Sequence, residues 1–223
     1  MDIEEKRNIM LGAKEWVKAN LPITLKIQNE SYGKLLIHAT IDCFAQMCGN
    51  YPPSNFNSDT FCRFVLRYSS YSKTFQQICP TTLHYHYDKE NDIKLTRGRI
   101  YQWDDPELVE EANRILHNIK EEQLRKTAQK KHTYIKLLYQ QRNKLVHELD
   151  NIGTKIEFSK DVPSIASGKD ISSSTIWTLN YPKLWLYNLA QETIYNFIED
   201  CMHNEKPLRF LDKERTTNLT WYI

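Results

Sequence analysis

The hydrophobic residues of this sequence recur mostly at spacings of three, four and seven, which is the pattern of an amphipathic helix. Ser58 or Asp59 can cap the start of one such segment, and the pair Asp105-Pro106 is a favourable start for another. Pro182 opens the last one. Helices are therefore expected at residues 2–19, 31–48, 60–75, about 106–129, about 132–149 and 182–202.

The helical pattern is interrupted at two places in the chain. Residues 79–104 mix aromatic, charged and turn-forming residues without a helical period, which predicts an irregular excursion. Residues 153–159 and 174–181 look like short strands on either side of a polar loop, 160–173. Together they predict a hairpin-like flap near 153–181, so the expected fold class is mainly α, a helical bundle with one small β excursion.

The chain has 223 residues, which is enough for one substantial hydrophobic core. It contains only six glycines, in keeping with a helix-rich fold. We therefore expect a single domain over residues 1–223, with its core at about 30–202 and a C-terminal tail at 203–223.

Composition and charge narrow the class of protein. Hydrophobic residues make up 40% and charged residues 26%, as in ordinary globular proteins, and the net charge of +2 excludes a general polycation. The five cysteines are odd in number and lack a CxxC pair, which favours free thiols in a reducing compartment. The N-terminus has no apolar signal core, and no apolar run approaches the roughly 20 residues that span a bilayer. A cytoplasmic protein without membrane contact is expected.

The helix expected at 132–149 carries polar residues where its apolar face should run. Arg142 lies four residues after Leu138 and four before Val146, so it falls on the buried stripe. Tyr139, Asn143 and His147 form a second line beside it, at i, i+4 and i+8. An arginine is buried at a high cost unless a partner or water satisfies it, so the stretch is a buried polar network or the wall of a wet cleft.

Arg142, Asn143 and His147 are residue types that can together cleave RNA without a metal ion. An arginine stabilises charge on a phosphate, and a histidine moves protons near neutral pH. Asn143 can orient either one. One helix supplies one histidine, so full acid–base catalysis calls for a second copy in a two-fold dimer. The alternative is a satisfied polar patch at a helix end.

The stretch "YIKLLYQQRNKLVHELD" resembles the signature helix of the HEPN superfamily, whose motif is an arginine, a short spacer and a histidine, with a polar residue directly after the arginine. Arg142, Asn143 and His147 match these three positions. The segments "GKLLIHATIDCFAQM" and "LNYPKLWLYNLAQETIYNFIED" resemble an early and a closing HEPN helix. The resemblance implies a helical bundle that dimerises, with Arg142 and His147 catalytic and Asn143 in support.

The resemblance further implies a metal-independent endoribonuclease that needs no cofactor. RNA would be its substrate, and an antitoxin or defence-system protein a possible partner, as in prokaryotic toxin–antitoxin and anti-phage systems. A tyrosine two residues after the histidine, which some of these toxins use for control, is replaced here by Leu149. The alternative within the same family is a non-catalytic module that dimerises in a defence complex.

Several further residues are candidates for supporting roles. Tyr139 lies one turn before Asn143, and Asp42, with His38 one turn before it, could satisfy Arg142 from another apolar helix. A local basic run precedes the motif, and it either attracts RNA phosphates or is a solvated helix face. The lysines expected to bind RNA are Lys130, Lys131, Lys136 and Lys144.

The segment "LHYHYD" offers a second kind of site. On a strand, His84 and His86 would point the same way and, with Asp88, could hold a metal, but no further ligand follows at a recognisable spacing. The alternative is an exposed aromatic loop, and the expectation is no metal. Aromatic residues of this region could instead stack on unpaired bases, namely Tyr85, Tyr87, Tyr101 and Trp103.

Overall fold

The computed structural model describes residues 3–48, 58–148, 161–169 and 175–203, except for a few side chains at the ends of these ranges. The described part is mainly helical, with a small antiparallel sheet in the order β1-β2-β3. The helices are α1 (Ile3–Asn20), α2 (Ile23–Lys26), α3 (Glu30–Cys48), α4 (Ser58–Tyr68), α5 (Ser72–Phe75), α6 (Pro80–Tyr87), α7 (Pro106–Asn118), α8 (Glu122–Lys131), α9 (Tyr134–Glu148) and α10 (Lys183–His203). The strands are β1 (Ile100–Gln102), β2 (Ser164–Lys169) and β3 (Thr175–Asn180).

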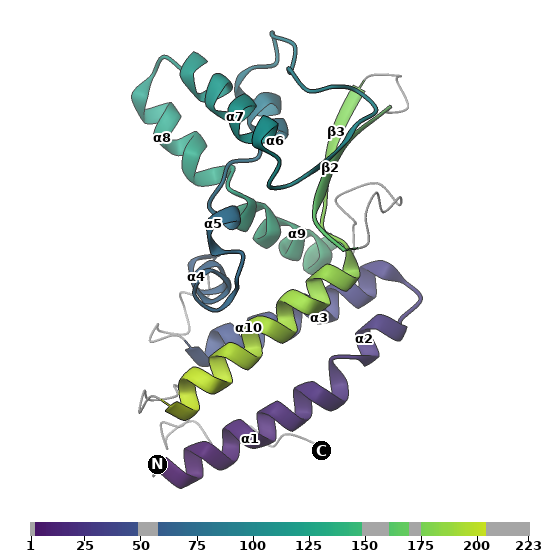
Figure 1. Cartoon of the computed structure of the whole chain (residues 1–223), viewed down its shortest axis with the longest axis vertical. Coiled ribbons are helices and arrows are strands. Elements are labelled where there is room, and N and C mark those ends of the chain that lie inside the picture. The colour runs from purple at the N-terminus through teal and green to yellow at the C-terminus, as the bar shows by residue number, and fades with distance from the viewer. Residues whose placement is uncertain (1–2, 49–57, 149–160, 170–174, 204–223) are drawn as a thin grey trace.

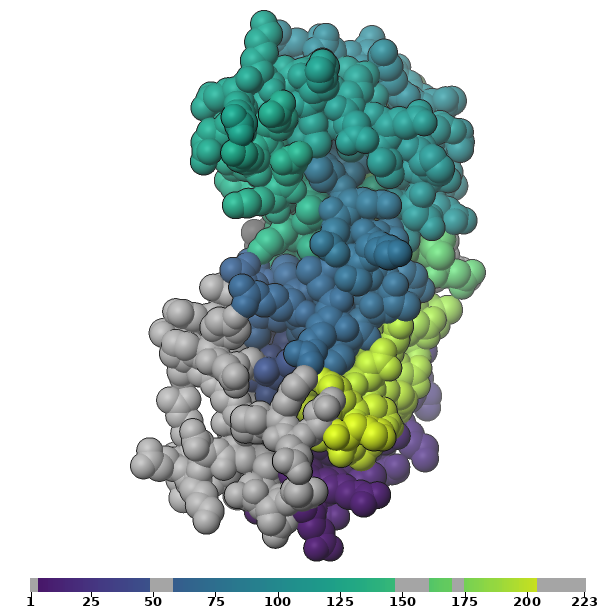
Figure 2. Space-filling view, turned by 60° about the vertical axis from the view of Figure 1, so that its left-hand side comes forward, coloured from purple at the N-terminus to yellow at the C-terminus, as the bar shows by residue number. Residues whose placement is uncertain are grey.

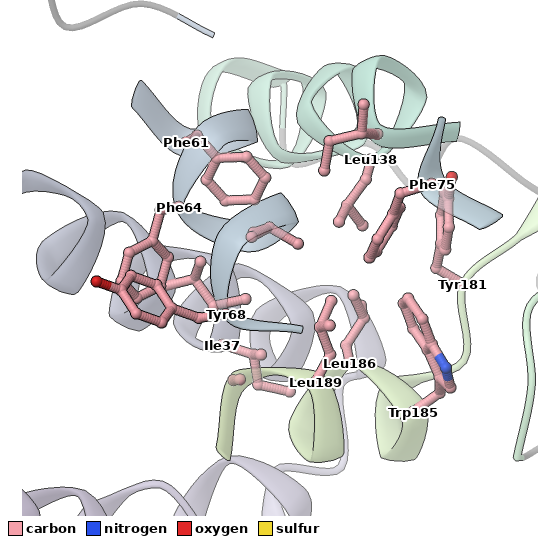
Figure 3. Close-up of a cluster of buried hydrophobic side chains, with 14 of the residues drawn as sticks. Ile37, Phe61, Phe64, Tyr68, Phe75, Leu138, Tyr181, Trp185, Leu186 and Leu189 are labelled. Carbon is pink, nitrogen blue, oxygen red and sulfur yellow. The ribbon is translucent and has the colours of Figure 1, made fainter. Parts of the chain in front are cut away.

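The main core lies between the long helices (Figure 1). Helix α10 packs against α1, α3 and α4, while α9 packs against α3 and α4. Figure 3 shows the centre of this core, where side chains from α3, α4, α5, α9 and α10 meet. Burying each of these large apolar side chains contributes about 1.5–3 kcal/mol relative to leaving it exposed. The largest fully buried ones include Ile37, Phe61, Phe64, Phe75, Tyr181 and Trp185.

A second, smaller hydrophobic cluster lies under α6, α7 and α8. These helices form one end of an elongated molecule, and α1 and the C-terminal part of α10 form the other (Figure 2). An ion network joins α7 to the end of α6, where Arg114 pairs with Glu111 at 2.7 Å and with Asp88 at 3.1 Å. Both carboxylate side chains are only 4% exposed, and Arg114 is the cation that these two buried groups share.

The expectation that residues 79–104 form an irregular excursion is wrong, because the segment contains a helix and a strand. Its first part is helix α6, which begins with Pro80 in the first turn, and its last part contains strand β1. The sequence conceals α6 because only Pro80, Thr81 and Leu83 are buried in it, which leaves no visible helical period. Strand β1 exists because it pairs with β2, far along the chain, with Tyr101 opposite Ile165.

The expected flap is partly wrong as well. The polar loop expected at 160–173 contains strand β2, which pairs with β3 from Ser164 opposite Asn180 to Lys169 opposite Thr175. Strand β3 agrees with the strand expected at 174–181. The strand expected at 153–159 lies outside the described residues.

The helix boundaries differ from the expectation in two further places. The segment expected as one helix at 60–75 is divided into α4 and α5, and the one expected at 106–129 is divided into α7 and α8. Helix α1, which precedes the core expected at 30–202, contributes Met10 and Val17 to the main core. The tail expected at 203–223 lies outside the described residues beyond His203.

Two expectations from composition can be compared with the structure. The five cysteines form no disulfide with one another. Of the helices in the described ranges, none is both long and apolar enough to cross a membrane.

Candidate functional site

Helix α9 carries the motif, and its start is fixed by three bonds to other parts of the chain. The Tyr134 amide donates to the Gln77 carbonyl at 3.0 Å, and the Tyr181 hydroxyl donates to the Tyr134 carbonyl at 2.8 Å. Just before α9, the Cys79 amide donates to the carbonyl of His132 at 2.9 Å. From this start, the buried Leu138 and Leu145 face the core.

Arg142 lies where α9 passes α3, and its guanidinium is bound by two neighbours. Asp42 Oδ2 lies 2.5 Å from both Nε and Nη2 of Arg142. Nη1 donates to the side-chain oxygen of Asn143 at 3.0 Å. The Arg142 side chain is still 23% exposed, and among the described residues only two of its five N–H groups, one on Nε and one on Nη1, donate a hydrogen bond. The expected contact with Asp42 is therefore present, and part of the cation still faces solvent.

Burial shapes the electrostatics of Asp42. It raises the pKa of the Asp42 carboxyl above its ordinary value, and the positive charge and hydrogen bond of Arg142 act in the opposite direction. The carboxylate side chain is 15% exposed, so Arg142 is its main source of compensation. The two residues satisfy each other across α3 and α9, which explains how an arginine can occupy a largely buried stripe.

His38 lies one turn before Asp42 on α3 and is fully buried. Burial, together with the charges of Arg142 and Lys34, lowers the pKa of His38 to about 3, and Gln141 partly offsets this. Within the described residues, neither ring nitrogen of His38 has a hydrogen-bond partner, and the same is true of Gln141 Oε1. His38 is thus a neutral imidazole behind the Asp42–Arg142 pair, and it packs 6.1 Å from the Phe61 ring.

Two other motif residues lie beside this pair. The Tyr139 ring lies 5.8 Å from the Arg142 guanidinium carbon and 5.6 Å from the Phe61 ring, and its supporting role stays a prediction. Asn143 is partly buried and contacts Arg142 directly. His147 belongs to α9 by its backbone, but its side chain lies outside the described part, as does Leu149. The catalytic roles of Arg142, Asn143 and His147 stay predictions.

The four lysines expected to bind RNA have different surroundings. Lys136 pairs with Asp59 at 2.8 Å and donates to the Ser58 hydroxyl, so its charge is already compensated. Lys130 and Lys131 are exposed at the end of α8. A helix rises about 1.5 Å per residue, so Arg142 lies about 12 Å beyond the start of α9, away from these two. Lys144 is exposed on α9 itself.

The histidines of "LHYHYD" do not form the expected strand geometry. They lie on helix α6, where His84 Nε2 contacts the Asn91 carbonyl at 2.7 Å and the His86 ring lies 5.0 Å from that of His132. Asp88 is bound to Arg114. In the parts of the chain that the structure describes, no three His, Cys, Asp or Glu side chains are grouped to hold a metal ion.

The proposed stacking of aromatic residues on bases is wrong for two of the four. Tyr101 is fully buried and Trp103 is 2% exposed, and both belong to the main core. Trp103 lies 5.0 Å from the Phe75 ring and 5.1 Å from the Trp185 ring, so neither of its faces is open to a ligand. Tyr85 is exposed at the surface of α6.

A pocket of about 530 Å³ lies between α9 and the β2–β3 hairpin, and sequence reasoning missed it. It is mostly apolar, with polar groups at several points of its wall. Lys144 was expected to bind RNA but not to line a pocket, while Lys169 and Trp177 come from the segment expected to be a flap. Its lining residues are Thr82, Leu137, Gln140, Gln141, Lys144, Gly168, Lys169, Ile176, Trp177, Thr178, Leu179 and Tyr181.

Comparison with known proteins assigns no family to this fold and site. No protein-family model matches the chain, and neither curated proteins nor solved structures give a significant match. The resemblance to HEPN proteins therefore depends on the sequences of α9, α3 and α10 alone.

Proposed function

We propose that this protein is a metal-independent endoribonuclease of the HEPN type. The observation that carries the proposal is the state of Arg142, which Asp42 and Asn143 hold in place while part of its guanidinium remains exposed. A fixed arginine with N–H groups to spare can bind a phosphate that gains charge in the transition state. The same helix supplies His147 five residues later.

The reaction proposed is transfer of a phosphodiester to the neighbouring 2′-hydroxyl. One histidine accepts the proton of the 2′-hydroxyl, its oxygen bonds to phosphorus, and the bond to the 5′-oxygen breaks. A second histidine protonates the departing 5′-oxygen, which leaves a 2′,3′-cyclic phosphate. Arg142 stabilises the charge on the phosphoryl oxygens, and Asn143 holds the guanidinium. Since each chain supplies one His147, the proposed active form is a homodimer with a composite site.

Such a nuclease is harmful to its own cell unless it is controlled. We therefore include in the proposal a toxin or anti-phage role, with an antitoxin or defence-system protein as partner. This part is supported by the HEPN resemblance of "RNKLVH" alone. RNA cleavage can be tested without knowledge of that partner.

A non-catalytic HEPN-like module is the second candidate, and the Asp42–Arg142 pair favours it. An ion pair that joins two packed helices is what a structural arginine forms. In this candidate, Arg142 holds α9 against α3, and the protein acts by dimerising in a larger complex.

The test incubates the purified protein with total RNA and with a tRNA pool in EDTA. The variants are His147→Ala and Arg142→Ala, with Arg99→Ala as a control because that arginine pairs with Glu107 and both side chains are about half exposed. If the protein is an enzyme, the wild type and the Arg99→Ala control should cleave RNA and leave 2′,3′-cyclic phosphate ends. His147→Ala and Arg142→Ala should then cleave no RNA while their melting temperatures stay unchanged. If the protein is a non-catalytic module, neither the wild type nor any variant should cleave RNA. Arg142→Ala should then lower the melting temperature or abolish the dimer.

A further inference from the structure

The pocket between α9 and the hairpin has the size of a ligand site. Its volume of about 530 Å³ falls in the range of small-molecule pockets, which is about 300–1,000 Å³. Three separate parts of the chain form its walls: Thr82 on α6, the face of α9 from Leu137 to Lys144, and the two strands of the hairpin. In Figure 1 the hairpin rises beside α9 toward α6 and α7.

The wall of the pocket combines a flat aromatic surface with amides. Trp177 is partly exposed there, and Leu137, Ile176 and Leu179 add apolar surface. Gln140, which is exposed, brings an amide with both donors and an acceptor. A planar, aromatic ligand with hydrogen-bonding edges fits this combination, and a nucleobase has all of these properties.

The described wall of the pocket carries positive charge. Lys144 and Lys169 lie on opposite walls, both exposed, and the described residues that line the pocket include no Asp or Glu. Among the described residues neither lysine has an ion-pair partner, in contrast to Lys136 with Asp59. Two such cations at the edge of an apolar pocket favour an anionic group on the ligand, and a phosphate is the anion that accompanies a base.

The pocket is close to position 147 of the motif along α9, whereas Arg142, two residues from both Gln140 and Lys144, is turned roughly 160° away toward α3. Gln140 and Lys144 are one turn apart on the same face of the helix, and position 147 follows Lys144 by three residues, one further turn. A strand of RNA with one base in the pocket would thus pass its next phosphate along this face of α9 toward position 147.

We propose that this pocket binds a nucleotide, with its base against Trp177 and its phosphate between Lys144 and Lys169. The proposal rests on the ribonuclease function where it identifies the nucleotide as part of single-stranded RNA beside the scissile bond. A free mononucleotide offers the same chemistry to the pocket.

Binding is measured with a fluorescently labelled 2′-O-methyl RNA hexamer, which has no 2′-hydroxyl and cannot be cleaved. The readout is therefore independent of catalysis, and a protein without nuclease activity can still pass the test. Fluorescence anisotropy gives Kd at several salt concentrations for the wild type, for Lys144→Gln/Lys169→Gln and for Trp177→Leu. The control is Lys18→Gln/Lys26→Gln, which removes two exposed lysines on α1 and α2. A mononucleotide competitor distinguishes the two sources of ligand.

We expect the lysine double variant to reduce the slope of log K against log salt by about 1 to 2, since each phosphate contact contributes about 0.7 for a single strand. Trp177→Leu should weaken binding by about fivefold or more, as for loss of a stacked base. The control should behave as the wild type. Competition by millimolar mononucleotide would assign the pocket to free nucleotides, and its absence would assign it to RNA.

Two results would overturn the proposal. One is no hexamer binding and no mononucleotide binding by the folded wild type. The other is binding that the lysine double variant leaves unchanged, because those exposed side chains can be replaced without unfolding the protein. Trp177→Leu is interpreted only at an unchanged melting temperature, since Trp177 also lies 6.3 Å from the Tyr101 ring. If binding follows these expectations while RNA remains uncleaved in EDTA, the nuclease proposal fails and the nucleotide site stands.

Discussion

Oδ2 of Asp42 on α3 accepts a hydrogen bond from Nε of Arg142 on α9, and the same oxygen forms an ion pair with Nη2. The pair joins two helices that are distant in sequence, and it lies beside the fully buried His38. The ion pair thus compensates the largely buried Asp42 carboxylate and fixes the orientation of the Arg142 guanidinium. Its contribution to stability can be measured separately from any catalysis.

The first prediction concerns the coupling of these two residues. Asp42→Asn should lower the free energy of unfolding by about 2 kcal/mol, below the 3–5 kcal/mol of a fully buried pair because both side chains are partly exposed. Arg142→Gln should cost a similar amount, and the double variant less than the sum of the two. Urea denaturation of the four proteins gives the coupling energy. Strictly additive losses would mean that the pair does not stabilise the fold.

The second prediction concerns pH and His38. Its pKa is about 3 in the folded protein, below the ordinary 6.5, so the unfolded chain binds the proton more readily. The stabilisation is complete above pH 6.5 and is lost as the pH falls toward 3. By this linkage His38 alone costs about 2 kcal/mol between pH 7.5 and pH 5.

The variant His38→Leu tests this effect. It removes the titrating group, and it also removes two ring nitrogens that have no partner among the described residues. We expect the variant to be at least as stable as the wild type at pH 7.5 and to lose less stability at pH 5, as measured by urea denaturation. The burial of His132 lowers its pKa to about 4 and makes both proteins acid-sensitive, so the difference between them is the relevant quantity. Equal pH slopes would contradict the prediction.

The third prediction compares two apolar residues on α9. Leu138 is fully buried in the main core, so Leu138→Ala should cost about 2–5 kcal/mol of unfolding free energy. Val146 is 41% exposed on the same helix, and Val146→Ala should change stability by about 0.5 kcal/mol or less. Thermal denaturation of both variants is sufficient. Similar losses would mean that α9 does not face the core as described.

The fourth prediction concerns the network around Arg114. Arg114→Met leaves the buried carboxylates of Asp88 and Glu111 without their cation and should cost about 3–5 kcal/mol. Arg99→Met is the matched control, because its pair with Glu107 is about half exposed and should contribute about 1 kcal/mol or less. Chemical denaturation of the two variants gives the comparison. Equal effects would show that burial does not distinguish the two arginines.

The sequence predicts well those elements that are determined by local periodicity. Helices α3, α9 and α10 follow from apolar residues at helical spacing, and the need of Arg142 for a partner follows from its place on the buried stripe. The partner itself is identified by chemistry, since Asp42 is an acid inside an otherwise apolar helix.

Features that depend on contacts between distant segments were not predictable in this way. Strand β2 has the sequence "SIASGK", which is small and polar, and it becomes a strand by pairing on both sides with β1 and β3. The pocket is another example, because Lys144 and Lys169 come together only when the hairpin lies beside α9. The spacing of Lys144 and Lys169 in the sequence does not indicate that they line the same pocket.

The pairing of β1 with β2 joins two distant parts of the chain, which has a consequence for how the protein folds. The Trp103 amide donates to the Pro163 carbonyl at 3.1 Å, directly beside the pairing of β1 with β2. Everything from α7 through α9 lies between these two points, so the pairing closes a long loop and must offset the conformational entropy lost in that closure. Contacts of this kind form late in folding, after local helices. Amide hydrogens of β1 and β2 should therefore be among the last to gain protection from exchange during refolding. Their protection reports the closure of the loop that contains α9.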